Sequence, residues 1–458
     1  MDGLATAGLT CPWCGHWATP ARDGAPPMPG TGSILRTVIV WFIATLLACL
    51  VGVLGYLAWT EKEDESGEGR AGGSTKVALG PRLTSWLSPS ELSAQPPTLA
   101  IDTIPGMPRV VEPRNLYSET QAGKLNPAVT NALPRVYVPN LRSHDVSVID
   151  PQTRKVVDRF RVGIGPQHVV PSWDLKTLWV TNNAEGRTDG SLTPIDPAIG
   201  KPGKPIPVDD PYNMYFTPDG RFAVVVAEAL KRLDLRDPGT MALLGTIEVP
   251  GCAGINHADF SIDGRFAIFT CEFQGSLAKI DLVERQVLGY LDLSKGGMPQ
   301  DVRISPDGKS FFVADMKAGG VFVIDGATFT KVGFVKTGVG THGLYPSRDG
   351  TQLYVANRGS TRIHGAPHGM GSVSVIDFAT RRVVATWPIP GGGSPDMGNV
   401  SADGKVLWLS GRYDDVVYAI DTGTGQIQSV IPVGKEPHGL TVWPQPGRYS
   451  LGHTGNTR

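Results

Sequence analysis

The sequence carries almost no net charge. Its 42 Lys and Arg residues nearly balance 43 Asp and Glu residues, which leaves a net charge of −1 over 458 residues, and this balance does not indicate a nucleic-acid partner. Serine-hydrolase, P-loop and dinucleotide-binding signatures in a strand–helix context are absent, as is an EF-hand-like calcium loop. Glycine and proline are plentiful instead, with 57 and 38 residues, which is typical of many short strands joined by turns.

One segment sets the pattern for most of the chain: residues 298–325, MPQDVRISPDGKSFFVADMKAGGVFVID. A short alternating run leads into a Pro-Asp-Gly turn, an apolar run follows, and a third run ends in Ile-Asp. This order predicts three antiparallel strands joined by tight turns, and residues 331–336 supply a fourth strand.

The same punctuation returns about every 44 residues. The turn aspartate recurs as Asp174, Asp219, Asp263, Asp307, Asp349 and Asp403, and the aspartate that ends the third strand recurs as Asp150, Asp196, Asp237, Asp281, Asp325, Asp377 and Asp421. Seven copies of a four-stranded sheet are therefore present. One such sheet cannot bury both faces alone, and a closed ring of sheets leaves only short edges. We predict an all-β fold, a seven-bladed β-propeller over residues 134–458.

Five segments carry a family resemblance: RVYVPN (135–140), TLWVTN (177–182), SPDGK (305–309), QLYVANRG (352–359) and SVSVID (372–377). They resemble the YVTN-type β-propeller repeat of bacterial and archaeal extracytoplasmic proteins. Related propellers include the haem domain of dissimilatory nitrite reductases, the copper-cluster domain of nitrous oxide reductase, lactonases and pure binding modules. The resemblance implies the fold and an extracytoplasmic, bacterial setting, and it selects no function.

The two ends of the repeat array predict how the ring closes. The last unit, EPHGLTVWP (436–444), has a first strand only, whereas residues 135–162 supply a second, third and fourth strand. Together they complete one blade from both termini, which prevents the ring from opening there. The following RYSLGHTGN (448–456) either competes for the second-strand position or lies over one face.

The first 33 residues, predicted to be a short cytoplasmic tail, contain the motif CPWCGH with Cys11, Cys14 and His16. A closed zinc site needs four ligands. The motif therefore predicts either a zinc ion shared with a second chain or a reduced, flexible tail.

Residues 34–60 are predicted to form a transmembrane signal-anchor helix. Residues 37–58 contain no charge, a length that crosses a bilayer as a helix and exceeds the core of a typical cleaved leader. Basic residues precede them and the acidic run 61–68 follows, so we expect a single-pass cell-membrane protein with a cytoplasmic N-terminus and an extracytoplasmic propeller. Residues 61–133 are predicted to be a stalk, of which 110–129 is apolar enough to dock on the propeller.

Histidines gather at one end of the predicted propeller, which we call the top. In an up-and-down sheet, the loop before strand one and the loop between strands two and three lie at this end, and the Asp-Gly turns lie at the other. First strands line the central channel, so residues about six positions before the turn aspartate should ring its mouth. This ring consists of His168, Asn213, His257, Asp301, His342, Met397 and His438.

All ring residues can ligate a metal or form hydrogen bonds, and histidine is the commonest protein ligand of copper and zinc. One hypothesis is a copper ion or haem held by four of them: His168, His257, His342 and His438. The alternative is that each imidazole bonds the backbone of a neighbouring blade. Cys252 and Cys271 approach the same end and, outside the cytoplasm, favour a disulfide over metal binding.

One unit carries a long insertion, residues 358–371. Its Arg358, Arg362, His364 and His368 are predicted to overhang the channel mouth and to hold an anionic ligand or a partner; otherwise the segment is a solvated Gly-rich loop. Further ionisable residues map near the mouth, as lactonase chemistry requires, although no spacing selects a pair. They are Glu185, Asp259, Glu272, Asp301, Arg303, Asp315, Arg358 and Arg412.

Three functions remain open from the sequence. The first is a membrane-anchored extracytoplasmic binding or scaffold module whose top face takes a protein, a glycan or a small molecule. The second is a metal- or haem-dependent oxidoreductase with the ring histidines as ligands. The third is a lactonase-like hydrolase, whose activity would survive chelation. Binding requires the fewest features beyond the fold.

Overall fold

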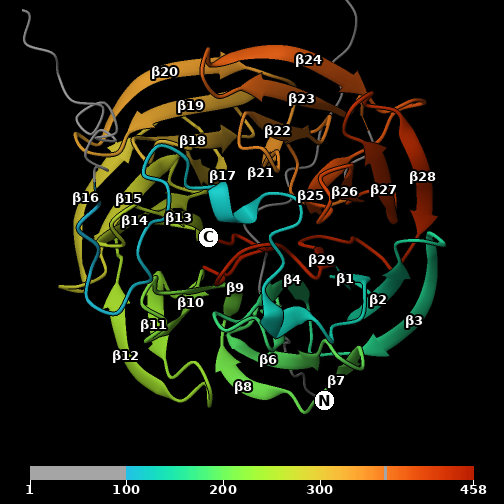
Figure 1. Cartoon of the computed structure of the whole chain (residues 1–458), viewed down its shortest axis with the longest axis horizontal. Helices are drawn as coiled ribbons and strands as arrows, with labels where there is room; N and C mark the ends of the chain where they lie inside the picture. Colours follow the sequence, from blue (N-terminus) through green and yellow to red (C-terminus); the bar gives the residue numbers. More distant parts are fainter. Residues whose placement is uncertain (1–99, 366–368) are drawn as a thin grey trace, which may run out of the picture. The chain divides into compact units, whose positions relative to one another are not determined.

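The architecture is a closed ring of seven antiparallel sheets around a central channel (Figure 1). The computed structural model describes residues 100–365 and 369–458. The predicted tail and its Cys11, Cys14 and His16, the predicted transmembrane helix and His368 all lie outside these residues.

Helices contribute little to the described ranges. They contain two 3-10 turns, η1 (Ser118–Thr120) and η2 (Pro127–Val129). Within this part of the chain, no helix has the length and apolar character needed to span a membrane.

Each blade has its first strand at the channel and its last strand at the rim. The closing blade consists of β29 (Thr441–Trp443), β1 (Arg135–Asn140), β2 (Asp145–Asp150) and β3 (Lys155–Arg161). The second consists of β4 (Pro166–Pro171), β5 (Leu178–Asn182), β6 (Asp189–Asp196) and β7 (Lys201–Pro202), with β8 (Ile206–Asp209) also paired to β6. The third consists of β9 (Pro211–Phe216), β10 (Ala223–Ala227), β11 (Arg232–Arg236) and β12 (Leu243–Glu248).

The remaining four blades follow in chain order. The fourth consists of β13 (Ile255–Phe260), β14 (Phe266–Cys271), β15 (Ser276–Asp281) and β16 (Gln286–Asp292), and the fifth of β17 (Pro299–Ile304), β18 (Ser310–Asp315), β19 (Gly320–Asp325) and β20 (Thr330–Lys336). The sixth consists of β21 (Thr341–Pro346), β22 (Gln352–Asn357), β23 (Ser372–Asp377) and β24 (Arg382–Pro388), and the seventh of β25 (Pro395–Val400), β26 (Val406–Gly411), β27 (Val416–Asp421) and β28 (Ile427–Pro432).

The seven-bladed prediction and its mode of closure are confirmed. Strand β29 pairs antiparallel with β1, with Val442 opposite Val136, so the last strand of the array completes the blade begun by the first. The segment 448–456 does not take the second-strand position, because β1 already occupies it.

The recurring turn aspartates hold the bottom turns. In the fifth blade, the Ser305 hydroxyl donates to Asp307 Oδ1 (2.5 Å), and the Lys309 amide donates to the same oxygen (3.2 Å). Gly308 follows with φ = 71°, a conformation that glycine adopts without a Cβ clash. The aspartates ending third strands act similarly: Asp325 Oδ1 accepts from the Thr328 amide (2.8 Å). Turn geometry thus accounts for the repeat's two markers.

The hydrophobic core lies between neighbouring blades. One cluster joins the third and fourth blades, where Tyr215 packs against Phe260 and Phe269, all 1% exposed or less. Comparable clusters join other adjacent blades. Each sheet therefore buries one face against each neighbour, as the ring arrangement requires.

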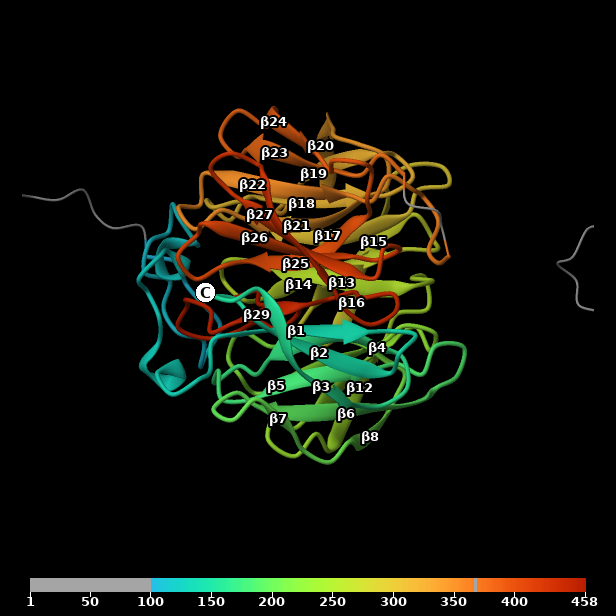
Figure 2. The same cartoon turned by 90° about the vertical axis from the view of Figure 1, so that its right-hand side faces the viewer.

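Two segments cover the bottom face, the end with the Asp-Gly turns (Figure 2). Residues 100–133, the described part of the predicted stalk, lie there: the Leu116 amide donates to Pro306 O (2.8 Å) and the Tyr117 hydroxyl to Ile304 O (2.6 Å). Residues 446–458 occupy the centre of the ring (Figure 1), where the Phe216 amide on the inner edge of β9 donates to Leu451 O (3.0 Å). This C-terminal segment, which we call the plug, brings residues into the channel from the bottom.

Candidate functional site

A pocket of about 210 Å³ lies at the top end of the channel. Its wall combines residues at the starts of first strands with residues from the loops between second and third strands. They include Gln167, Tyr212, Gln300, Glu185, Glu228, Glu272, His342, Arg358, His364, Arg412 and His438. The pocket is therefore rich in both carboxyl and cationic groups.

Asp396, at the start of β25, organises the cationic side of this pocket. Its carboxylate accepts from Arg358 Nε (2.6 Å) and from His438 Nδ1 (2.7 Å), and it lies 3.2 Å from His342 Nδ1 and 3.8 Å from Arg412 Nη1. Its side chain is fully buried. Burial alone would raise the pKa of Asp396, but Arg358 and the other cationic neighbours hold it below its usual value. The group is thus a carboxylate at neutral pH.

These contacts fix the protons of two predicted ring histidines. Arg358 donates from Nη2 to Nε2 of His342 (2.7 Å), so the proton of His342 is on Nδ1, facing Asp396. His438 donates from Nδ1 to Asp396, and its Nε2 faces the Tyr212 hydroxyl (3.4 Å). Both nitrogens of each ring therefore have a partner within the protein.

The opposite side of the pocket carries glutamates. Glu272 is buried and accepts from Asn256 Nδ2 (2.7 Å). Burial raises the pKa of Glu272, and burial together with the charge of Glu272 raises that of Glu228 well above its usual value. The pair therefore favours the protonated form more than isolated glutamates do, because two neighbouring carboxyls resist double ionisation.

Two pocket groups have a buried polar atom without a hydrogen-bond partner within the described residues. Gln167 Oε1 and Arg412 Nη1 are buried without a hydrogen-bond partner, and the half-buried carboxyl of Glu228 faces the same cavity. Leaving such a group unpaired costs about 1–3 kcal/mol. These groups therefore mark where a polar ligand would find partners.

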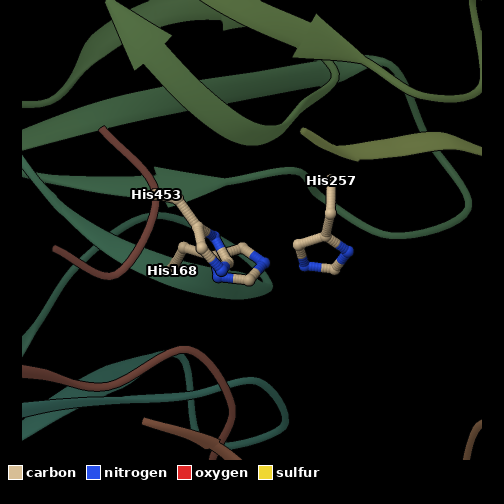
Figure 3. A group of neighbouring side chains, drawn as sticks. All are labelled: His168, His257 and His453. Carbon is tan, nitrogen blue, oxygen red and sulfur yellow. The ribbon is translucent and has the colours of Figure 1, made fainter. Parts of the chain in front are cut away.

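A second group of histidines lies close together outside the pocket lining (Figure 3). His168 from β4, His257 from β13 and His453 from the plug are fully buried, and one nitrogen from each lies within 4.8 Å of the others. Both ring nitrogens of His168 and of His257 lack a hydrogen-bond partner within the described residues. Burial is the main cause that lowers the pKa of all three below its usual value, so the rings are neutral.

The other predicted ring residues surround these two groups of histidines. Asn213 donates from Nδ2 to Nδ1 of His453 (2.8 Å), and Asp301 lies 3.5 Å from His453 Nε2. Met397 Sδ lies 3.0 Å from Nδ1 of His342. The structure thus brings the predicted ring together and divides its histidines into a partnered pair and a pair without partners.

The insertion reaches the pocket in two different ways. Arg358 does not overhang the mouth, because it is only 2% exposed and forms part of the wall. His364 does lie over the pocket, where its ring contacts Glu185 (2.7 Å) and Glu436 (3.1 Å). Hydrogen bonds to these two carboxylates raise the pKa of His364. These two contacts therefore hold the described part of the insertion over the channel mouth.

Two further predicted features lie elsewhere. Cys252 and Cys271 form a buried disulfide at the top end of the fourth blade, where Cys271 ends β14. Asp259 and Arg303 are placed deeper than the mouth: Asp259 bonds Arg458 of the plug (2.6 Å), and Arg303 bonds Asp301 (2.7 Å). Neither of these last two lines the pocket.

Sequence reasoning missed the residue directly before each ring position. In six units this residue is polar, and several of the six line or support the pocket: Gln167, Tyr212, Asn256, Gln300, Thr341 and Asp396. This recurring polar position could have been recognised from the repeat. No repeat position pointed to His453 in this way, because its place depends on where the plug folds.

Comparisons with known proteins identify the fold. The family model described as YNCE-like β-propeller matches residues 108–446. No curated protein sequence matches the chain. Among solved structures, a putative 6-phosphogluconolactonase from Bacteroides uniformis is 16% identical with a TM-score of 0.54, over 67% of this chain and 98% of that one.

Two other solved structures are similar to the chain. The dihydro-heme d1 dehydrogenase NirN is 17% identical with a TM-score of 0.51, over 67% of this chain and 75% of that one. Hydrazine synthase from Kuenenia stuttgartiensis is 21% identical with a TM-score of 0.49, over 59% of this chain and 87% of that one. At 16–17% identity, the likeness to NirN and to the putative lactonase concerns the propeller fold and leaves the chemistry of the site open.

Proposed function

The chain belongs to the YNCE-like β-propeller family, and we propose that it is a binding protein whose top pocket takes a small polar ligand. The observation that carries this proposal is a pair of buried polar atoms without partners, Gln167 Oε1 and Arg412 Nη1, in a cavity that the Glu228 carboxyl also lines. A guanidinium nitrogen attracts an anionic group, whereas the two oxygen acceptors favour hydroxyl or amino groups.

The size of the pocket limits the ligand. A cavity of about 210 Å³ is smaller than sites for drug-sized ligands, which begin at about 300 Å³. We therefore propose a small organic acid that also carries hydroxyl or amino groups. Haem is larger than most drug-sized ligands and does not fit this pocket, whereas a single metal ion needs far less room.

The test is a thermal-shift screen of small hydroxy, sugar and amino acids, followed by calorimetric titration of each ligand found. Glu228→Ala should weaken binding about tenfold, because a buried ligand group left without its hydrogen-bond partner costs about 1–3 kcal/mol. Glu284→Ala, at an exposed glutamate on a bottom turn, is the matched control and should bind like the wild type. Equal affinity of the Glu228 variant and the wild type would refute this pocket as the binding site.

The same variant distinguishes a lactonase-like hydrolase from a binding protein. Glu228 and Glu272 form the kind of carboxyl pair that general acid–base chemistry uses, so hydrolysis of an added lactone, lost in Glu228→Ala and kept with a chelator, would favour a hydrolase. Capture of a protein or glycan that is unaffected by the Glu228 change would place recognition elsewhere on the propeller.

The proposed setting is a cell membrane, with the propeller outside the cytoplasm and residues 34–60 as the anchor. The uncharged run at 37–58 and the charge difference across it support this orientation. Protease added to intact cells should digest the propeller. Protection from protease, with digestion only after lysis, would reverse the proposed topology.

A further inference from the structure

The histidines below the pocket floor come from three separate parts of the chain. His168 belongs to β4, His257 to β13 and His453 to the plug, and their rings face one another (Figure 3). The centroids of His257 and His453 lie 4.9 Å apart, those of His168 and His453 5.2 Å, and those of His168 and His257 5.4 Å. The ring contacts therefore close a triangle.

This triangle lacks the partners that buried imidazoles normally have. Both nitrogens of His168, both nitrogens of His257 and Nε2 of His453 make no hydrogen bond within the described residues, and all three side chains are fully buried. More than about 90% of buried polar groups in folded proteins are paired with protein or with water. A single electron-pair acceptor at the centre of the triangle would satisfy these nitrogens together.

We propose that His168, His257 and His453 bind one transition-metal ion of the type that imidazole prefers, copper or zinc. The donor set consists of nitrogen atoms only, which suits these borderline metals. This inference goes beyond the proposed ligand pocket, since neither depends on the other. The remaining coordination position would face the pocket floor, where the His438 ring lies 4.9 Å from that of His168.

The distances are close to those that an ion needs. Three nitrogens up to 4.8 Å apart lie about 2.8 Å from the centre of their triangle, whereas copper and zinc bind imidazole nitrogen at about 2.0–2.1 Å. Each ring must therefore move inward by about 0.7 Å, which a small change in side-chain torsion supplies. No change of the β-strands is required.

Two contacts must adjust for His453 to take part through Nε2. That nitrogen now lies 3.5 Å from Asp301 Oδ1 and must turn from this carboxylate toward the ion. The ring proton would then reside on Nδ1, which now accepts a hydrogen bond from the amide of Asn213 (2.8 Å). A half-turn of that amide would present its oxygen to the proton, at the cost of the hydrogen bond that this oxygen now accepts from the Met214 amide (2.8 Å). Such support from a neighbouring oxygen is common for histidines that bind metals.

His342 and His438 do not belong to this ligand set. Their Nδ1 atoms face the carboxylate of Asp396, and their Nε2 atoms face Arg358 and Tyr212. The set therefore replaces two of the four ligands expected from the sequence with a single one, His453.

The experiment measures metal in the full-length chain, purified without a metal-binding tag. All proteins carry Cys11→Ser and Cys14→Ser, because that motif is itself a predicted zinc site. Each protein is prepared from cells supplied with copper or zinc and, separately, refolded with either ion, so that slow entry into a buried site does not hide binding. Elemental analysis gives the stoichiometry, and electron paramagnetic resonance of the copper form counts bound nitrogens.

We expect about one ion per chain and a copper signal with three nitrogen ligands. His257→Gln and His453→Gln should each lower metal affinity at least tenfold, whereas the control His364→Gln, in the pocket above, should retain the ion. Circular dichroism verifies that each variant is folded.

Three results would overturn the proposal. One is a folded protein that holds less than a tenth of an equivalent of metal after both loading routes, in which case buried water satisfies the nitrogens. The second is metal that persists in the His257 and His453 variants. The third is metal lost only in His364→Gln, which would place the ion in the pocket. Loss of the ion with unchanged pocket binding, or the reverse, separates this site from the proposed ligand site.

Discussion

Replacing Asp396 with asparagine tests whether the cationic side of the pocket depends on one carboxylate. Arg358 is only 2% exposed and lies 2.6 Å from Asp396, which is fully buried. Removing one member of a buried pair costs about 3–5 kcal/mol, because the other charge stays buried without a partner. At about 2 °C per kcal/mol, the lower end for domains of 150–250 residues, the thermal midpoint should fall by about 6–10 °C at pH 7.

The pH dependence of this loss has a definite sign. The pKa of Asp396 is lowered in the folded state, so its charge contributes stability that is fully present above the unfolded pKa of about 3.9 and is lost as the pH falls through the folded value. Thermal unfolding followed by circular dichroism should give a constant difference between wild type and variant from pH 7 to about pH 5. Below about pH 4 the difference should shrink.

Two comparisons complete this experiment. Asp307→Asn makes the same change in an exposed bottom turn, where asparagine can accept the same hydrogen bonds, and should stay within about 0.5 kcal/mol of the wild type. Adding Arg358→Gln to Asp396→Asn should destabilise by less than the sum of the two single changes. A fall in midpoint no larger than that of Asp307→Asn would refute the reasoning.

Other expectations concern the plug, the disulfide and the insertion. Leu451→Ala should lower the free energy of unfolding in urea by about 2–5 kcal/mol, because Leu451 is 2% exposed. Leu244→Ala, at a 57% exposed leucine, should change it by no more than about 0.5 kcal/mol. Equal effects of the two changes would contradict the plug's burial. The variant with Cys252→Ala and Cys271→Ala should lose about 3 kcal/mol, since the disulfide closes a loop with a separation of 19 residues, and unchanged stability would oppose this. The pKa of His364 measured by NMR should lie above about 6.5, its ordinary value. The stability that its contacts contribute is then fully present below about pH 6.5 and is lost as the pH rises through the folded pKa. A measured pKa at or below about 6.5 would contradict the two carboxylate contacts.

The pocket was partly predictable because its inner wall follows the repeat. Ring residues such as His168 and His342 occupy one position in successive blades, and a fixed phase in the repeat places that position at the channel. The polar residue before each ring position has the same phase, so Asp396 could have been found in the same way. The position of a residue in the repeat does not determine which side chain it contacts. Which histidine meets Asp396, and which stays without a partner, depends on side-chain packing across the channel.

The sequence by itself determined the number of blades, the turns and the closure of the ring. These features depend on local interactions, such as the Ser305 hydroxyl with Asp307, and on a strand pattern that repeats until the ring is complete. Only the tertiary structure decided that His453, nearly 200 residues after His257, joins His168 in the channel. The plug pairs with the inner edge of β9, a contact made by backbone groups that carries no pattern of side chains to read in advance.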